Sequence, residues 1–149
     1  MYREFNQEGG HPAVTIEFTD KEFRRLLDMV YIGNWILNST RGTERFADYD
    51  YIESKVFAQC AKLPEMHALF EIRDGEVLPP RAYEDGGIHE AILDYEDTVF
   101  FEILAEELAR KDMDFEPIGP DNFLELTDRI DEYIEEFEQN GVENISLDK

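Results

Sequence analysis

The pattern of apolar and polar positions is helical over most of the chain, and one stretch organises the rest. Residues 19–38 begin with the capping-box pattern of Thr19 followed by Glu22. No charged residue occurs between Met29 and Leu37. Because a helix that is apolar all round is normally buried on all sides, we expect a central helix here, with other helices packed around it.

Three further stretches carry apolar residues at steps of three and four, which is typical of amphipathic helices. They cover residues 44–63, 88–111 and 120–139. Pro64 ends the first of them, and Asn140-Gly141 is a stop signal for the last. The pattern therefore predicts a mainly α fold, a single-domain bundle of four long helices.

Two short segments near the ends of the chain have the pattern of strands. Residues 13–18 alternate apolar and polar side chains, and residues 142–147 carry three apolar side chains at less regular spacing. Since the first segment needs a partner and the second is the best candidate, we expect a short β pair that ties the termini together.

Residues 64–87 allow two interpretations. PEMHALFEI has the pattern of a short helix with Pro64 at its first position. LFEIRDGEVL has the pattern of a hairpin around Asp74-Gly75, a strong turn dipeptide. The alternation on either side of the turn is brief, and this favours the helix.

Composition indicates one globular domain. The chain has 149 residues, 42% of them hydrophobic, and a single cysteine, Cys60, so no intramolecular disulfide forms. Residues 1–12 are polar and predict a flexible arm, and residues 13–149 predict the domain. No segment approaches the roughly 20 apolar residues that span a bilayer, and the N-terminus lacks a signal-peptide pattern. We therefore expect a cytoplasmic protein that does not bind membranes.

The net charge of −22 is concentrated in the second half of the chain. Residues 1–75 hold 9 Lys and Arg against 13 Asp and Glu, whereas residues 76–149 hold 5 against 23. A field of this sign repels nucleic acid and anionic membranes and attracts basic proteins or peptides. The alternative is a surface charged for solubility alone.

The helix over residues 120–139 carries the densest acidic face and a single basic residue, Arg129. We interpret this face as the surface that binds a basic partner. It would alternatively mimic the phosphates of DNA, or be a solvated face with no partner. The candidate binding residues are Asp128, Asp131, Glu132, Glu135 and Glu136.

Signatures of catalysis are scarce in the sequence. It contains no P-loop, GxGxxG, CxxC or GxSxG pattern. Paired carboxylates one helical turn apart are how all-helical nucleotide pyrophosphatases hold magnesium, and two such pairs occur. In a chain with 36 acidic residues such pairs also arise by chance. The candidate metal ligands are Asp50, Glu53, Asp94 and Asp97.

A few residues in other settings complete the candidates. The run Asp112, Asp114 and Glu116 resembles a calcium loop, but Pro117 and Phe123 stand where an EF-hand needs glycine and a bidentate acid. Only a looser cation site is left there. Cys60, Trp35 and Asn34 favour packing in the core, and a buried Asn34 must find hydrogen-bond partners, through which it would fix helix register or line a pocket.

We therefore expect a small acidic, non-enzymatic interaction protein that binds a basic partner and needs no cofactor. One alternative is a magnesium-dependent phosphoester or nucleotide hydrolase, for which a divalent metal would be required. A second is a DNA-mimic inhibitor. Amphipathic helices often leave a spare apolar strip, which would also allow a homodimer.

Overall fold

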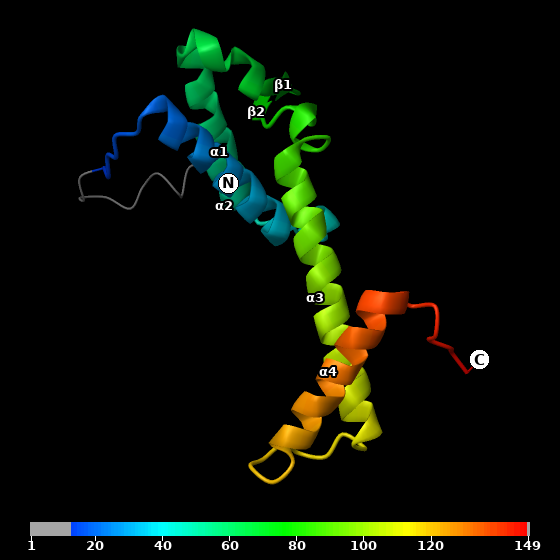
Figure 1. The fold of residues 1–149 in the computed structure, drawn as a ribbon. Coiled ribbons are helices and arrows are strands. Elements are labelled where there is room, and N and C mark those ends of the chain that lie inside the picture. The colour runs from blue at the N-terminus through cyan, green and yellow to red at the C-terminus, as the bar shows by residue number, and fades with distance from the viewer. Residues whose placement is uncertain (1–12, 149) are drawn as a thin grey trace. The chain divides into compact units, whose positions relative to one another are not determined.

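The computed structural model describes residues 13–148 and is mainly α (Figure 1). The predicted arm, residues 1–12, lies outside the described residues. The longer helices are α1 (Asp20–Asn38), α2 (Ala47–Phe57), α3 (Gly87–Asp112) and α4 (Phe123–Asn140), and the strands are β1 (Glu71–Arg73) and β2 (Glu76–Leu78). Short 3-10 helices cover Gly42–Glu44, Ala58–Lys62, Pro64–Leu69 and Arg81–Tyr83.

The chain divides into two compact units, Met1–Ile92 and Leu93–Lys149, which we describe separately. The mainly α prediction is confirmed, whereas the four-helix bundle is not. The prediction of one domain over residues 13–149 stays a prediction. Among the described residues, no helix combines the length and the apolar character needed to cross a membrane.

The start of α1 is the predicted capping box. The backbone N–H of Glu22 donates to the hydroxyl of Thr19 at 3.4 Å, and the backbone N–H of Thr19 donates to the Glu22 carboxylate at 2.8 Å. This hydrogen bond from the Thr19 backbone lowers the pKa of the Glu22 carboxyl. Two donors at the helix start are thereby satisfied by residues that the sequence alone identifies.

The expectation that α1 is buried on all sides is wrong. Its buried residues follow one face at steps of three and four: Leu27, Tyr31, Asn34 and Asn38. Met29 is 70% exposed and Ile36 is 58% exposed. The helix is amphipathic in the structure because its buried face includes two asparagines, which a hydrophobicity pattern assigns to the polar side.

The core of the first unit lies against this face of α1. Leu27, Phe57, Cys60 and Met66 are fully buried, and Ile92 at the start of α3 joins them. Cys60 is therefore a small buried core residue, as the sequence predicts. The predicted helix 44–63 is shorter than expected, because the α-helical part ends at Phe57 and the chain continues to Lys62 as a 3-10 helix.

The predicted β pair between residues 13–18 and 142–147 is wrong, since neither segment is a strand. The two-stranded sheet is instead the hairpin β1–β2, antiparallel, with Ile72 opposite Val77. Asp74 and Gly75 have φ angles of 53° and 82°, as a two-residue hairpin turn requires. A local turn closes a far shorter loop than the two ends of the chain would. Residues 64–87 thus contain both interpretations in succession, a short helix over Pro64–Leu69 and then the hairpin.

The second unit contains most of α3, together with α4. Ala105 and Ala109 of α3 are fully buried, and Met113, Leu126 and Phe137 are nearly so. The two alanines add little apolar area to this core. Seven large apolar side chains of this unit outside the C-terminal tail are instead mostly exposed: Leu93, Tyr95, Phe100, Ile103, Phe115, Phe123 and Leu124.

Candidate functional site

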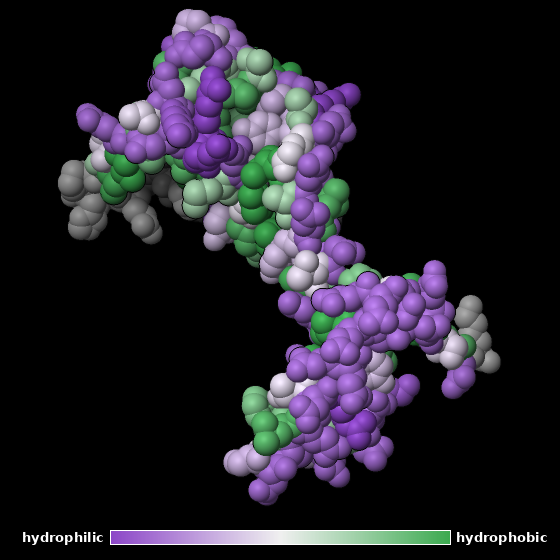
Figure 2. Space-filling view, in the orientation of Figure 1, coloured by the Kyte–Doolittle hydropathy of each residue, from purple (hydrophilic) through white to green (hydrophobic). Residues whose placement is uncertain are grey.

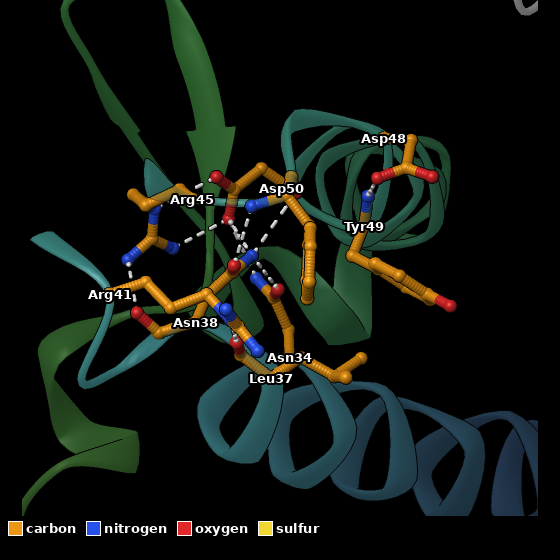
Figure 3. A network of polar contacts seen from close by, with 9 residues as sticks. Asn34, Leu37, Asn38, Arg41, Arg45, Asp48, Tyr49 and Asp50 are labelled. Carbon is orange, nitrogen blue, oxygen red and sulfur yellow. Dashed lines mark hydrogen bonds and ion pairs between the residues drawn. The ribbon is translucent and has the colours of Figure 1, made fainter. Parts of the chain in front are cut away.

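A network of polar side chains links α1 to the start of α2, and Asp50 is its centre (Figure 3). Arg45 binds this carboxylate through two nitrogens, Nη2 to Oδ1 at 2.6 Å and Nε to Oδ2 at 2.9 Å. From α1, the amides of Asn34 and Asn38 donate to Oδ1 at 3.0 and 3.3 Å. Such bidentate, charge-assisted contacts fix the geometry of both partners.

Asn38 is fully buried and forms hydrogen bonds with the backbone at the start of α2. Its Oδ1 accepts the N–H of Phe46 at 2.8 Å, and its Nδ2 donates to the Phe46 carbonyl at 3.2 Å. Phe46 is the N-cap residue of α2 and has no capping side chain of its own. An asparagine from the preceding helix therefore takes the place of a local cap.

Asp50 and Glu53 lie one turn apart on α2, and their surroundings shift the pKa values of the two carboxyl groups in opposite directions. The hydrogen bond from Arg45 is the main reason that the pKa of Asp50 is lowered. Burial raises the pKa of Glu53 to about 7, because the side chain leaves water without a full set of partners. The amide of Asn34 and the charge of Arg45 oppose this rise, whereas the negative charge of Asp50 adds to it. Glu53 is 8% exposed.

Glu53 lines a pocket of about 380 Å³ in the first unit. Tyr31, Asn34 and Trp35 contribute one wall from α1, and the segment after β2 contributes another. The lining from α2, the hairpin and their neighbours consists of Arg45, Glu53, Arg73, Leu78, Pro79, Pro80 and Glu84. Arg45 and Glu53 also line a second pocket of similar size.

Aromatic rings set the shape of the α1 wall. The ring centroids of Tyr31 and Trp35 are 6.1 Å apart, and the Trp35 ring meets that of His89 edge-on at 4.6 Å. The Tyr31 hydroxyl lies 3.0 Å from Nδ1 of His89. Burial, followed by the charges of Glu84 and Glu53, raises the pKa of Tyr31 to about 12. Both of these carboxylates line the pocket.

The four candidate metal ligands fall into two pairs. Asp50 and Glu53 belong to the first unit, whereas Asp94 and Asp97 are exposed residues of α3 in the second. Across residues 13–148 there is no group of three or more Asp, Glu, His or Cys side chains arranged to hold a metal ion. Asp50 already accepts hydrogen bonds from three side chains. The magnesium site stays a prediction, and the geometry gives it no support.

The second unit has a groove of about 710 Å³ between α3 and α4. Four apolar side chains line it, namely Phe101, Ile130, Ile134 and Phe137. The Phe101 and Phe137 rings pack with centroids 5.4 Å apart. The remaining lining residues are Thr98 and five acids: Asp97, Glu102, Glu106, Asp131 and Glu138.

Most of these acids have no positive partner. Glu106 forms an ion pair with Arg110 at 2.8 Å, but within the described part of the chain the other four acids of the groove have none. Arg129, the one basic residue of α4, is held by Glu125 at 2.9 Å and approaches Asp112 at 3.9 Å. The groove therefore combines an apolar lining with uncompensated negative charge.

The predicted acidic face of α4 extends this charge beyond the groove. Asp128, Asp131, Glu132 and Glu135 are exposed, while Glu136 is half-buried and accepts hydrogen bonds from Asn140 and Asn144. Of the five predicted binding residues, only Asp131 lines the groove. Hydrophilic residues cover most of the visible surface of α4, with apolar residues between them (Figure 2).

Sequence reasoning did not identify the acids that α3 contributes to the groove. Asp97 was assigned to a metal site, and Glu102 and Glu106 were assigned no role. Glu102 and Glu106 are four residues apart, so they lie one helical turn apart, and Glu102 follows Phe101 directly. This spacing is the feature of the sequence that could have indicated an acidic edge beside an apolar residue. Comparisons with known protein families, with curated proteins and with solved structures gave no match.

Proposed function

We propose that this chain is a non-enzymatic interaction protein whose second unit binds a basic, amphipathic segment of another protein in the groove between α3 and α4. The observation that carries the proposal is the pairing of four apolar lining residues with four unpaired acids in one groove. An amphipathic helix with lysine or arginine beside its apolar face matches this chemistry. The cytoplasmic localisation expected from the sequence belongs to the same proposal.

Charge decides between a basic partner and a second copy of this chain. Residues 93–149 hold 4 Lys and Arg against 19 Asp and Glu, a net charge of −15. A second copy would bring the same negative charge to the groove, and like charges brought together at an interface cost several kcal/mol. A basic partner would instead be attracted before contact, which raises the association rate.

The exposed apolar residues of the second unit support the same proposal. The unit leaves seven large apolar side chains mostly exposed, so it would gain stability from a partner that covers them. Phosphate mimicry by α4 is the rival interpretation, and it would depend on charge spacing alone. A partner segment would depend on the apolar lining as well.

The test uses a designed helical peptide with lysines on one face and leucines on the other, titrated into the 149-residue chain by calorimetry. We expect the double variant Asp131→Lys, Glu138→Lys to weaken binding by about tenfold or more, because both acids line the groove. The control Asp121→Lys, Glu143→Lys makes the same change in net charge at exposed residues that do not line the groove.

Two results would contradict the proposal. Equal weakening by both double variants would show that net charge, and not the groove, attracts the peptide. Unchanged binding after Ile134→Ala would show that the apolar lining is not used. The same variant would also be compared with the unmodified chain for displacement of duplex DNA from a basic DNA-binding protein. Equal displacement by both would favour phosphate mimicry over peptide binding in the groove.

A further inference from the structure

The first unit contains a pocket whose chemistry the groove does not explain. It has room for a small molecule, with about 380 Å³ of space and lining residues from α1, α2 and the segment around the hairpin. Small-ligand sites of this kind combine apolar walls with a few converging polar groups. The question is which of its polar groups are left without partners inside the protein.

On the acidic side, Glu53 is the most deeply buried carboxylate of the pocket. It is 92% buried by its exposed fraction of 8%, yet it forms no ion pair within the described residues. A carboxylate accepts up to about four hydrogen bonds, and the amide of Asn34 is the hydrogen-bond partner that favours its charged form. Glu84 also lines the pocket, and its charge, like that of Glu53, raises the pKa of Tyr31.

On the basic side, Arg73 has an unused donor. Its Nε is buried without a hydrogen-bond partner, although it forms a long ion pair with the Glu71 carboxylate at 3.6 Å. Its Nη2 reaches the carbonyl of Pro79 at 3.4 Å, a long contact. The other arginine of the pocket, Arg45, is already paired with Asp50. Arg73 is therefore the pocket arginine that keeps a buried donor without a hydrogen bond, and such a donor favours an added acceptor.

Tyr31 and Trp35 complete the pocket between these charges. Their tilted rings form a wall against which an ammonium group gains attraction from the π faces. A ligand with only a positive charge would leave the Arg73 donor unused, and a ligand with only a negative charge would meet Glu53 and Glu84. A molecule that carries both charges satisfies the two sides together.

We infer that this pocket binds a small zwitterion with an ammonium group and a carboxylate, that is, a free amino acid or a close analogue. The ammonium group contacts Glu53 and the rings of Tyr31 and Trp35, and the carboxylate accepts from Arg73. The site is separate from the groove of the second unit and does not depend on the proposed function.

The experiment measures the melting temperature of the 149-residue chain with each common amino acid at millimolar concentration, followed by ligand-observed NMR for those that raise it. We expect one or a few amino acids to raise the melting temperature, because a ligand that binds only the folded state stabilises it. We expect Glu53→Gln and Arg73→Gln each to weaken binding by about tenfold or more. The control Glu65→Gln removes a charge from an exposed position that does not line the pocket, and it should leave binding unchanged.

Two probes separate the contributions of the charges. The decarboxylated amine of the best amino acid lacks the group that Arg73 would bind. It should therefore bind the unmodified protein more weakly than the amino acid does. The Arg73→Gln variant should bind the amine and the amino acid equally well. Absence of any amino-acid effect on melting and NMR would overturn the inference. Tighter binding of the amine than of the amino acid would also overturn it, since the pocket would then be a site for cations only.

Discussion

The two units use their apolar and polar residues in opposite ways. The first unit buries large side chains such as Phe57 and Leu27, and it also buries Asn34 and Asn38 with their partners in place. The second unit buries alanines at its helix contact and leaves aromatic residues such as Phe100 exposed. Folding is stabilised by apolar area removed from water. The first unit is therefore stabilised more by its own buried side chains than the second unit is. The second unit has the composition of a surface that a partner completes.

The largest expected effect comes from the loss of a buried ring from the first unit. We expect Phe57→Ala to lower the free energy of unfolding by about 3–5 kcal/mol, because it removes a fully buried ring and leaves a cavity. The matched change Leu124→Ala in the second unit, where Leu124 is 73% exposed, should change it by less than about 0.5 kcal/mol.

Urea titration followed by fluorescence measures this, because the single tryptophan, Trp35, lies in the first unit. Circular dichroism follows the helices of both units in the same samples. A loss of stability in Leu124→Ala as large as that in Phe57→Ala would contradict the exposed position of Leu124 and the difference between the two units.

An intermediate effect is expected from the asparagine that organises the start of α2. Asn38→Ala removes the partner of the Phe46 N–H and of the Phe46 carbonyl, so we expect a loss of about 1–3 kcal/mol. Gln139→Ala, at an exposed position of α4, is the control and should stay within about 0.5 kcal/mol. Hydrogen exchange of the α2 amides locates the effect, which should be largest in the first turn of that helix. An equal loss in both variants would argue against a capping role for Asn38.

The smallest effect concerns the charge of Glu53 and depends on pH. The pKa of Glu53 is about 7 in the folded protein, above its usual value of 4.5, so the folded state holds a proton that the unfolded state has lost between these values. Stability therefore falls as the pH rises through this window, and the ionised side chain costs stability above it. We expect Glu53→Gln to stabilise the protein by about 1 kcal/mol at pH 8 and to change it little at pH 5.

The difference between the variant and the unmodified protein isolates this residue. Asp50, whose pKa is lowered by Arg45, contributes stability that is lost only as the pH falls below its usual range, so its contribution is constant between pH 5 and 8. Melting curves at the two pH values, without ligand, are sufficient. Destabilisation of the variant at pH 8 would show that the Glu53 charge is compensated in the folded protein.

Local signals in the sequence predicted local structure well. Thr19 and Glu22 form the capping box, and Gly141 ends α4 with a φ angle of 56°. These features depend on residues a few positions apart, whose chemistry is visible in the sequence. The Asp74-Gly75 turn was visible too, but brief flanking strands made it look weaker than it is. The predicted pairing of the two chain ends depended on contacts far apart in sequence, and it was wrong.

The buried face of α1 shows why the site was harder to predict. Hydrophobicity assigns Met29 and Ile36 to the interior and Asn38 to the surface, and the structure has the reverse. Asn38 is buried because Phe46 and Asp50, outside its own helix, supply its partners. Asp50 and Glu53 look equivalent in the sequence, and only the position of Arg45 makes one a paired anion and the other a group that favours its proton.

Burial of Cys60 has a practical consequence for the study of this chain. It is the one cysteine in the sequence, it is fully buried, and burial raises the pKa of its thiol. A thiol reagent reacts with the exposed thiolate, so modification must wait until the first unit opens. The rate of alkylation of Cys60 therefore reports how often that unit opens. Mass spectrometry measures this rate even in a mixture with other proteins. The second unit contains no cysteine, so this rate reports on the first unit without an added label.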